Sequence, residues 1–458
     1  MPHTRPCYEP SLSSGPPLPS ISLPYALSLF HSLPHPATTL VHNVLIRFHL
    51  SICPSSPLLA IRLFSRLRGL FLYPDHHSFP LAISASSRLR HIPLGQALHA
   101  QSLRFGFSGD LFVCNALISM YSSIDYLPDA YRVFVEQIQV VDTVSYNALM
   151  YGYARAGDLE MVHHLFDGMP QRDAVSWGTI ISAYSRARRP NDALRLFERM
   201  QADGLQPDNV ALASALSCCA QLGELAKGKA IHEYITTNKS ELTVKLSTGL
   251  VDMYAKCGAI NTAMNVFDAS PCKNLFTWNA LIIGLAMHGY GKLSLNYFNK
   301  MRACGVQPDG ITLLGVLVAC SHSGLTEIAR ELFDVMETVH GVRRELKHYG
   351  CMADLLGRAG LIKEAMEMID GMPMQGDAFV WGGVLTGCRM HRGNVGFAEI
   401  AARHLLQLDP WDSGVYSIMV GIYAQEARWE DVARIRRLME GLKVKSAGLS
   451  LVEVFELG

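Results

Sequence analysis

Residues 275–309, LFTWNALIIGLAMHGYGKLSLNYFNKMRACGVQPD, decide the fold of this chain. Apolar side chains recur there at i, i+3, i+4 and i+7, the spacing of one helical face: Trp278, Leu281, Ile282 and Leu285. A second apolar face follows at Leu293, Tyr297, Met301 and Cys304. Gly289 and Gly291 are expected to end the first helix and Gly305 the second, because glycine tolerates the backbone angles of a helix stop. Neither apolar face can be fully buried within this segment, so the unit needs neighbouring units that pack against it.

Similar segments supply those neighbours. Residues 175–208 align with the segment almost position for position, and residues 143–173 and 244–274 are shorter versions of it. A helix-turn-helix period in the low to mid thirties is typical of an α-solenoid. We therefore predict an all-α, right-handed superhelical α-solenoid of helix-turn-helix repeats. The phase of the first segment gives ten units: 39–75, 76–110, 111–142, 143–173, 174–208, 209–243, 244–274, 275–309, 310–345 and 346–377. Two further helix pairs are expected at 378–411 and 412–445, and a strand-like segment at 449–455.

The composition limits the possible surfaces and sites. Lys plus Arg and Asp plus Glu each number 40, so the net charge is zero and any nucleic-acid surface must be a local stripe. The sequence has no run of 18 uncharged apolar residues, which argues against a membrane span. The eleven cysteines include no CxxC pair, which favours buried thiols over a zinc site. Residues 1–38 are rich in Ser, Pro and His, which is compatible with a transit peptide or with a disordered tail.

Several long segments resemble the pentatricopeptide repeat proteins of land plants. These are YNALMYGYARAGDLEMVHHLFDGMP (146–170), LVDMYAKCGAINTAMNVFD (250–268) and VQPDGITLLGVLVACSHSGL (306–325). The alternation of long, medium and short units resembles the PLS subclass. Residues 348–373, followed by 380–410 and 416–440, resemble the last repeat and the E extension of that subclass. The resemblance implies a leader at 1–38, a repeat array at 39–377, an E extension at 378–445 and a tail at 446–458 without a DYW deaminase domain.

In such an array one base of single-stranded RNA is read per repeat by two or three side chains. The resemblance places the reading residues at the fifth and last positions of a unit. The fifth positions hold Asn43, Asn115, Asn147, Thr248 and Asn279, and the last positions of the same units hold Asp75, Asp142, Asp173, Asn274 and Asp309. By resemblance, Asn with Asp favours uracil and Thr with Asn favours adenine. Gly178 with Asp208 occupies the same two positions but fits no clear pair, and neither does Gly350 with Asp377.

Each of these residues also has a structural interpretation. Asn near a helix start and Asp just before one are ordinary capping residues, although their joint recurrence at two fixed positions favours base reading. The aromatic residues beside them are expected to pack in the core: Trp177, Trp278, Tyr146 and Trp381. Lys229, Lys256 and Lys292 either contact phosphate or simply lie on a solvated face.

No catalytic motif accompanies the repeats. The sequence has no GxSxG, no GxxxxGK[ST] and no HxE…PCxxC zinc-deaminase signature, so we expect no enzyme activity, no cofactor and no metal. The resemblance implies a plant organelle, mitochondrion rather than chloroplast, and a site-recognition factor for C-to-U RNA editing. A DYW-type deaminase or an editing accessory protein would then bind through 378–445. The alternatives are a factor for RNA processing, splicing or stability, and a protein-binding helical scaffold, which would not require the recurrent Asn/Asp pair.

Overall fold

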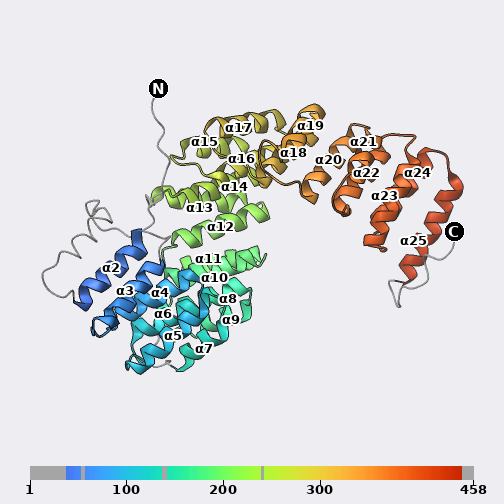
Figure 1. Ribbon diagram of the computed structural model, residues 1–458. Coiled ribbons are helices and arrows are strands. Elements are labelled where there is room, and N and C mark those ends of the chain that lie inside the picture. Colours follow the sequence, from blue (N-terminus) through green and yellow to red (C-terminus); the bar gives the residue numbers. More distant parts are fainter. Residues whose placement is uncertain (1–37, 53–56, 137–141, 239–241, 446–458) are drawn as a thin grey trace. The chain divides into compact units, whose positions relative to one another are not determined.

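The computed structural model describes residues 38–52, 57–136, 142–238 and 242–445 (Figure 1). These residues are all helices and connecting turns, with no strand among them, so the predicted all-α class is confirmed. Residues 1–37 of the proposed leader 1–38 and the strand-like segment 449–455 lie outside the described residues. No helix within the described part is long and apolar enough to span a membrane. The chain divides into two compact units, 1–222 and 223–458.

The first unit is a stack of helix pairs that begins at α2 and ends at α12. In each pair the first helix also packs on the first helix of the following pair. The helices are α2 (Thr39–Ile52), α3 (Pro57–Gly69), α4 (Ser78–Leu89), α5 (Ile92–Arg104), α6 (Leu111–Ser123), α7 (Leu127–Glu136), α8 (Thr143–Ala156), α9 (Leu159–Asp167), α10 (Ala174–Arg186), α11 (Pro190–Ala202) and α12 (Asn209–Leu222).

The second unit repeats the same packing with α14, α16, α18, α20, α22 and α24 as the first helices of successive pairs. Its helices are α13 (Leu225–Thr237), α14 (Val244–Lys256), α15 (Ile260–Ala269), α16 (Leu275–Met287), α17 (Gly291–Ala303), α18 (Gly310–Ser323), α19 (Thr326–Val335), α20 (Leu346–Arg358), α21 (Ile362–Asp370), α22 (Ala378–Met390), α23 (Val395–Leu408), α24 (Ser413–Gln425) and α25 (Trp429–Lys445).

Helices α16 and α17 show why the repeat sequence folds as it does. The Asn274 side chain accepts the backbone N–H of Thr277 and so caps α16, and Gly289, with a φ of 79°, lies in the turn after that helix. Trp278 is buried, with its ring edge-on to the ring of Phe267 in the preceding pair. Tyr297 of α17 also packs edge-on against the Phe267 ring. The apolar face predicted from the spacing is therefore the core.

Two details of the predicted helices are wrong. Gly291 does not end α16 but begins α17, where it lies against α18: a Cβ on Gly291 would lie 2.6 Å from the carbonyl oxygen of Ala319. Cys304 is exposed at the end of α17 and does not belong to the apolar face. The contact with α18 decides the role of Gly291, and Cys304 is exposed because it lies just past the last residue of α17.

Close contacts between successive first helices depend on small residues. In α22, a Cβ on Gly383 would lie 2.7 Å from the backbone nitrogen of Asp354 in α20, whereas a Cβ on the adjacent Gly382 would meet nothing within 4 Å. We expect Gly383→Ala to lower the free energy of unfolding by about 1–3 kcal/mol, because overpacking moves backbone. Gly382→Ala is the matched control and should raise it by roughly 0.5–1 kcal/mol, because alanine is the better helix former. Chemical denaturation measures both, and equal effects of the two variants would contradict the packing.

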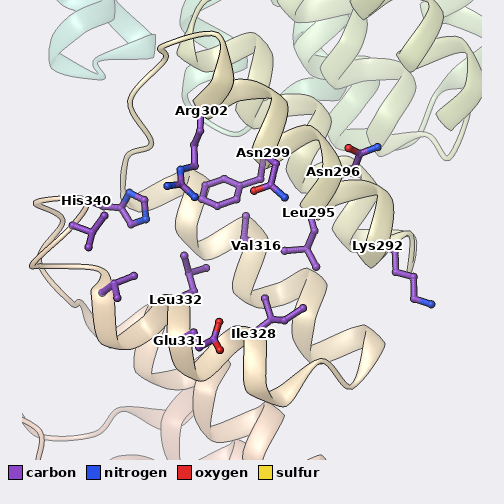
Figure 2. A pocket seen from close by; sticks show the side chains of 13 residues that line it. Lys292, Leu295, Asn296, Asn299, Arg302, Val316, Ile328, Glu331, Leu332 and His340 are labelled. Atoms are coloured by element: carbon purple, nitrogen blue, oxygen red, sulfur yellow. The ribbon is translucent and has the colours of Figure 1, made fainter.

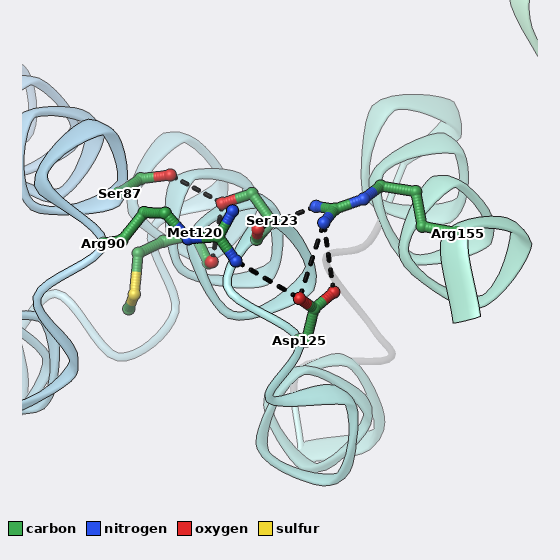
Figure 3. A network of polar contacts seen from close by, with 6 residues as sticks. All are labelled: Ser87, Arg90, Met120, Ser123, Asp125 and Arg155. Atoms are coloured by element: carbon green, nitrogen blue, oxygen red, sulfur yellow. Dashed lines mark hydrogen bonds and ion pairs between the residues drawn. The ribbon is translucent and has the colours of Figure 1, made fainter. Parts of the chain in front are cut away.

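Polar side chains join successive repeats at the C-terminal ends of the first helices. Asp125 bridges Arg90 and Arg155, which belong to the repeats on either side of its own, with closest N–O distances of 3.3 Å (Figure 3). Arg155 also donates to the backbone carbonyl of Ser123 at the end of α6. Arg88, His322 and His391 likewise reach a carbonyl near the end of the preceding first helix, at Leu50, Ala286 and Arg358 respectively. These bonds satisfy carbonyl groups that a helix end leaves unpaired.

Candidate nucleic-acid interface

The fold brings the fifth residue of one repeat against the last residue of the same repeat. In four units the Asn side-chain amide donates to the Asp carboxylate. The Nδ2–Oδ1 distances are 2.9 Å for Asn43 and Asp75, 3.1 Å for Asn115 and Asp142, 3.2 Å for Asn147 and Asp173, and 3.0 Å for Asn279 and Asp309. The two positions lie 26 to 32 residues apart in sequence, so only the repeat fold can bring them together.

The two residues of a pair have different local roles. Asp142, Asp173 and Asp309 are helix N-caps, and each accepts the backbone N–H of the third residue of the following helix. The capping interpretation is therefore right for these aspartates. It is also right for Asn274, which caps α16, but it is wrong for the fifth-position asparagines: Asn147, for example, is the fifth residue of α8 and lies inside the helix. An Asn at this position gains nothing from capping, so its recurrence needs the contact with Asp or a further role.

In three of these four units a hydroxyl group contacts both the Asn and the Asp. Ser145 and Thr312 lie at the third position of the helix that the Asp caps, and their oxygens accept the backbone N–H of that Asp. The Thr312 hydroxyl also lies 2.6 Å from Asn279 Oδ1 and 2.8 Å from Asp309 Oδ1. Ser78 contacts both partners in the same way, at 2.8 Å from Asn43 Oδ1, and Ser145 contacts Asn115. In the unit 143–173, by contrast, the Ser176 hydroxyl donates to Asp173 alone, and Asn147 Oδ1 has no partner among the described residues.

These hydrogen bonds keep Asp75, Asp173 and Asp309 ionised. Burial raises the pKa of Asp309, but the hydrogen bonds from Thr312 and Asn279 outweigh that effect, and the net pKa lies below its usual value. The pKa values of Asp75 and Asp173 are lowered for the same reasons. The Asp is therefore an acceptor at neutral pH, and it holds the Nδ2 side of the amide toward itself. The second Nδ2 proton and the second lone pair of Oδ1 remain for another partner.

The other predicted pairs are arranged differently. Thr248 does not contact Asn274 directly: its hydroxyl lies 2.7 Å from that of Thr277, which in turn donates to Asn274 Oδ1 at 2.9 Å. Gly178 lies beside Asp208, since a Cβ on Gly178 would be 2.9 Å from Asp208 Oδ1, and that oxygen accepts only backbone N–H groups. Gly350 lies under the ring of Phe379, which fills the place of a side chain there.

Exposed apolar side chains lie next to the polar pairs, and the sequence analysis did not identify them as part of the site. They are the second residues of the first helices, three positions before the fifth residue and hence on the same helical face. The exposed fractions are 58% for Phe112, 56% for Val144, 52% for Val175, 64% for Phe276 and 43% for Ile311. An apolar residue two positions after each cap, outside the i, i+3, i+4 pattern of the core, was the available signal. Flat or branched apolar groups spaced one repeat apart can contact the faces of successive bases.

The aromatic residues beside the site belong to the core, as predicted. Trp177, Trp278 and Trp381 are no more than 6% exposed. Trp177 packs edge-on to Phe166, Tyr146 packs edge-on to Phe134, and Trp381 stacks on His404. Of the three lysines considered for phosphate contacts, Lys256 is paired with Asp252 at 2.9 Å, while Lys229 and Lys292 are exposed.

A separate hollow lies on the second helices of the repeats. It encloses about 590 Å³ between α17 and α19, with Phe298, Leu295 and Val316 among its apolar lining and Arg302 and His340 at one end (Figure 2). Asn296 and Asn299 of α17 line this hollow, but none of the Asn and Asp residues that pair between the fifth and last positions does. Among the described residues, no group of three or more His, Cys, Asp or Glu side chains could hold a metal ion.

Comparison with known protein families finds matches along the repeats. The model described as "PPR repeat" matches residues 144–173, 276–306 and 347–377, the model "PPR repeat family" matches 172–221, and the model "E motif" matches 392–453.

Three curated proteins of Arabidopsis thaliana are similar to most of the chain, and all three are named pentatricopeptide repeat-containing proteins. The first is 46% identical over 93% of this chain and 87% of its own length. The second, described as chloroplastic, is 33% identical over 94% of this chain and 72% of its own length. The third, described as mitochondrial, is 42% identical over 67% of this chain and 50% of its own length.

Proposed function

The chain belongs to the pentatricopeptide repeat family, and from that premise we propose that it binds single-stranded RNA of a plant organelle in a sequence-specific manner. The observation that carries this proposal is the hydrogen bond from Asn to Asp in four separate repeats. The amide keeps one donor and one acceptor free, which is what a Watson–Crick edge requires of its partner. The exposed apolar second residues flank each amide and are suited to contact the base faces.

Each repeat then reads one base. The units that begin at residues 39, 111, 143 and 275 are proposed to prefer uracil, and the unit that begins at 244 is proposed to prefer adenine. The carboxylate of the pair accepts a hydrogen bond from the amide, and its proposed role is to hold the amide in place for the base. Gly178 offers no side chain to a base, and Asp208 is the only polar group of its unit at these positions.

Competition among homopolymers tests this function in its simplest form. With the full chain bound to a labelled single-stranded RNA, an oligouridine should compete about tenfold better than an oligocytidine of equal length, because one good base contact is worth about 1–3 kcal/mol. All measurements must be made at the same salt concentration, because phosphate contacts add salt-dependent affinity without base selectivity. Equal competition by every homopolymer would leave only non-specific binding and would contradict base reading.

The finer role we propose is recognition of a cytidine for C-to-U editing. The match of residues 392–453 to the E motif supports it, and residues 378–445 would bind a DYW-type deaminase or an editing accessory protein. Relatives described as mitochondrial and as chloroplastic support an organellar location. Sequencing of organelle transcripts after loss of the protein tests the role. One or a few cytidines should remain unconverted; altered transcript ends, unspliced introns or lost transcripts would instead favour processing, splicing or stability.

A further inference from the structure

A hydroxyl residue accompanies every unit that has a polar fifth residue. The third residue of the following unit is Ser78, Ser145, Ser176, Thr277 or Thr312 where the fifth residue is Asn43, Asn115, Asn147, Thr248 or Asn279. In the other five units the fifth residue is Pro80, Gly178, Ala213, Leu314 or Gly350, and the third residue of the following unit is then Val113, Ala211, Leu246, His348 or Val380. The two positions are therefore coupled across the boundary between repeats in all ten units.

Capping does not explain this coupling. Asp110, Asp208 and Asp377 precede first helices and accept the backbone N–H of a third residue that has no hydroxyl. The cap therefore forms equally well with Val113, Ala211 or Val380 at that position. What the hydroxyl adds is a contact with the fifth residue: Thr312 with Asn279 at 2.6 Å, Ser78 with Asn43 at 2.8 Å, and Thr277 with Thr248 at 2.7 Å.

The hydroxyl has a single proton and two acceptors within reach. In the last of the four Asn units, Asp309 Oδ1 already accepts the backbone N–H of Thr312 and the Nδ2–H of Asn279. Asn279 Oδ1 has no other donor among the described residues, and Asn279 is only 4% exposed. A buried amide oxygen without a donor is costly, so the hydroxyl proton is best placed on Asn279 Oδ1.

The two contacts together fix which way the amide faces. Asp309 takes a proton from Nδ2, and Thr312 gives a proton to Oδ1, so the order of the free donor and the free acceptor is set. Every base has donors and acceptors on its Watson–Crick edge, and a freely turning amide could match more than one order of them. An amide that cannot turn can match only one. In this unit the discrimination between bases thus depends on both anchors of the amide.

We propose that the hydroxyl of the third residue is a positioning residue for base reading in the preceding repeat. This inference rests on the proposed RNA-binding function. It adds a third position, supplied by the next repeat, to the reading sites in which the hydroxyl contacts the fifth residue, those of units 39–75, 111–142, 244–274 and 275–309. It also identifies the units without the hydroxyl as units that do not select a base through an amide. Thr312 is buried and acts only through Asn279.

Base preference opposite the unit 275–309 tests the proposal. The full chain is bound to an RNA pool randomised at single positions, and the uracil preference opposite that unit is compared among variants. Thr312→Val should reduce the preference about five- to tenfold, the value of one hydrogen bond. Thr312→Ser keeps the hydroxyl and should retain the wild-type preference. Affinity for a homopolymer that does not match the site should not differ between the variants.

The chain offers a matched control for the lost capping contact. Ser176→Ala also removes a hydroxyl that accepts the backbone N–H of its Asp, but this hydroxyl donates to Asp173 and makes no bond to Asn147. It should leave the uracil preference opposite the unit 143–173 within about twofold of the wild type, which is below the effect of one hydrogen bond. If Thr312→Val does not fold, Ser145→Ala tests the same contact in the unit 111–142.

The outcomes separate the two proposals. If the wild type prefers uracil and Thr312→Val prefers it equally, the positioning role is wrong and base reading stands. If Ser176→Ala loses its preference as much as Thr312→Val does, the lost cap is responsible and the positioning role is also wrong. If the wild type shows no preference at any position, the RNA-reading function itself fails.

Discussion

Replacing Asn279 with aspartate is expected to destabilise the protein by about 3–4 kcal/mol at neutral pH. The new carboxylate would lie about 3 Å from that of Asp309, in the place of the amide that now donates to it. Two carboxylates at this distance cannot both ionise cheaply, and the pKa of the pair rises by about 2–3 units. Each unit of pKa shift corresponds to about 1.4 kcal/mol.

The pH dependence of this variant has the opposite sign to that of the wild type. A raised pKa in the folded state means that protons are taken up on folding, so stability increases as the pH falls from 7.5 to 5. In the wild type the pKa of Asp309 is lowered, and its stabilising effect is lost only as the pH falls below the ordinary carboxyl range. Asn279→Ala is the control, since it removes the hydrogen bond without adding charge. Thermal unfolding midpoints measure all three, and a variant Asn279→Asp that does not gain stability on acidification would contradict the contact.

Much of the fold could be predicted from the sequence because the same helix-turn-helix pattern recurs in every repeat. The apolar spacing of Trp278, Leu281, Ile282 and Leu285 corresponds to a buried face, and α16 begins at Leu275, where the phase of the segment begins. The role of Gly291 could not be predicted, because the same residue suits a helix stop and a close contact with the backbone of the next helix. Only the position of the neighbouring repeat distinguishes the two.

The candidate site was predictable in part for a similar reason. Recurrence singled out Asn279 and Asp309, and the fold places them in contact, while their role toward RNA remains a prediction. The contribution of Thr312 was not recognised, because Ser or Thr after an Asp is an ordinary capping signal and its second contact crosses the repeat boundary. The exposed Phe276 was missed because it lies outside the apolar spacing that identifies the buried face, Trp278, Leu281, Ile282 and Leu285.

Exchanging the polar pairs of two adjacent units is expected to exchange their base preferences. The units 244–274 and 275–309 share a threonine at the third position of the following helix, Thr277 and Thr312, and differ in the pair itself. Asn279→Thr with Asp309→Asn should convert the second unit from uracil to adenine. The cap survives, because Asn274 already caps α16 with an amide oxygen. We expect a reversal of about tenfold or more, since a base contact is worth about 1–3 kcal/mol.

The reciprocal change is the matched control for that exchange. Thr248→Asn with Asn274→Asp should convert the unit 244–274 from adenine to uracil and leave the neighbouring unit unchanged. A variant that loses affinity for every RNA equally would indicate a damaged fold. A variant that keeps its original preference would show that these residues do not read the base.

Selection from a fully randomised single-stranded RNA pool tests the central claim most directly. One base per repeat predicts the order U-N-U-U from the units that begin at 39, 76, 111 and 143, and A-U from those that begin at 244 and 275, read in either strand direction. The wild-type chain should enrich both patterns. The exchanged variant, Asn279→Thr with Asp309→Asn, should change the second pattern from A-U to A-A and leave the first pattern unchanged. A pool without an enriched motif, or a motif that the exchange leaves as it was, would contradict base reading by these residues.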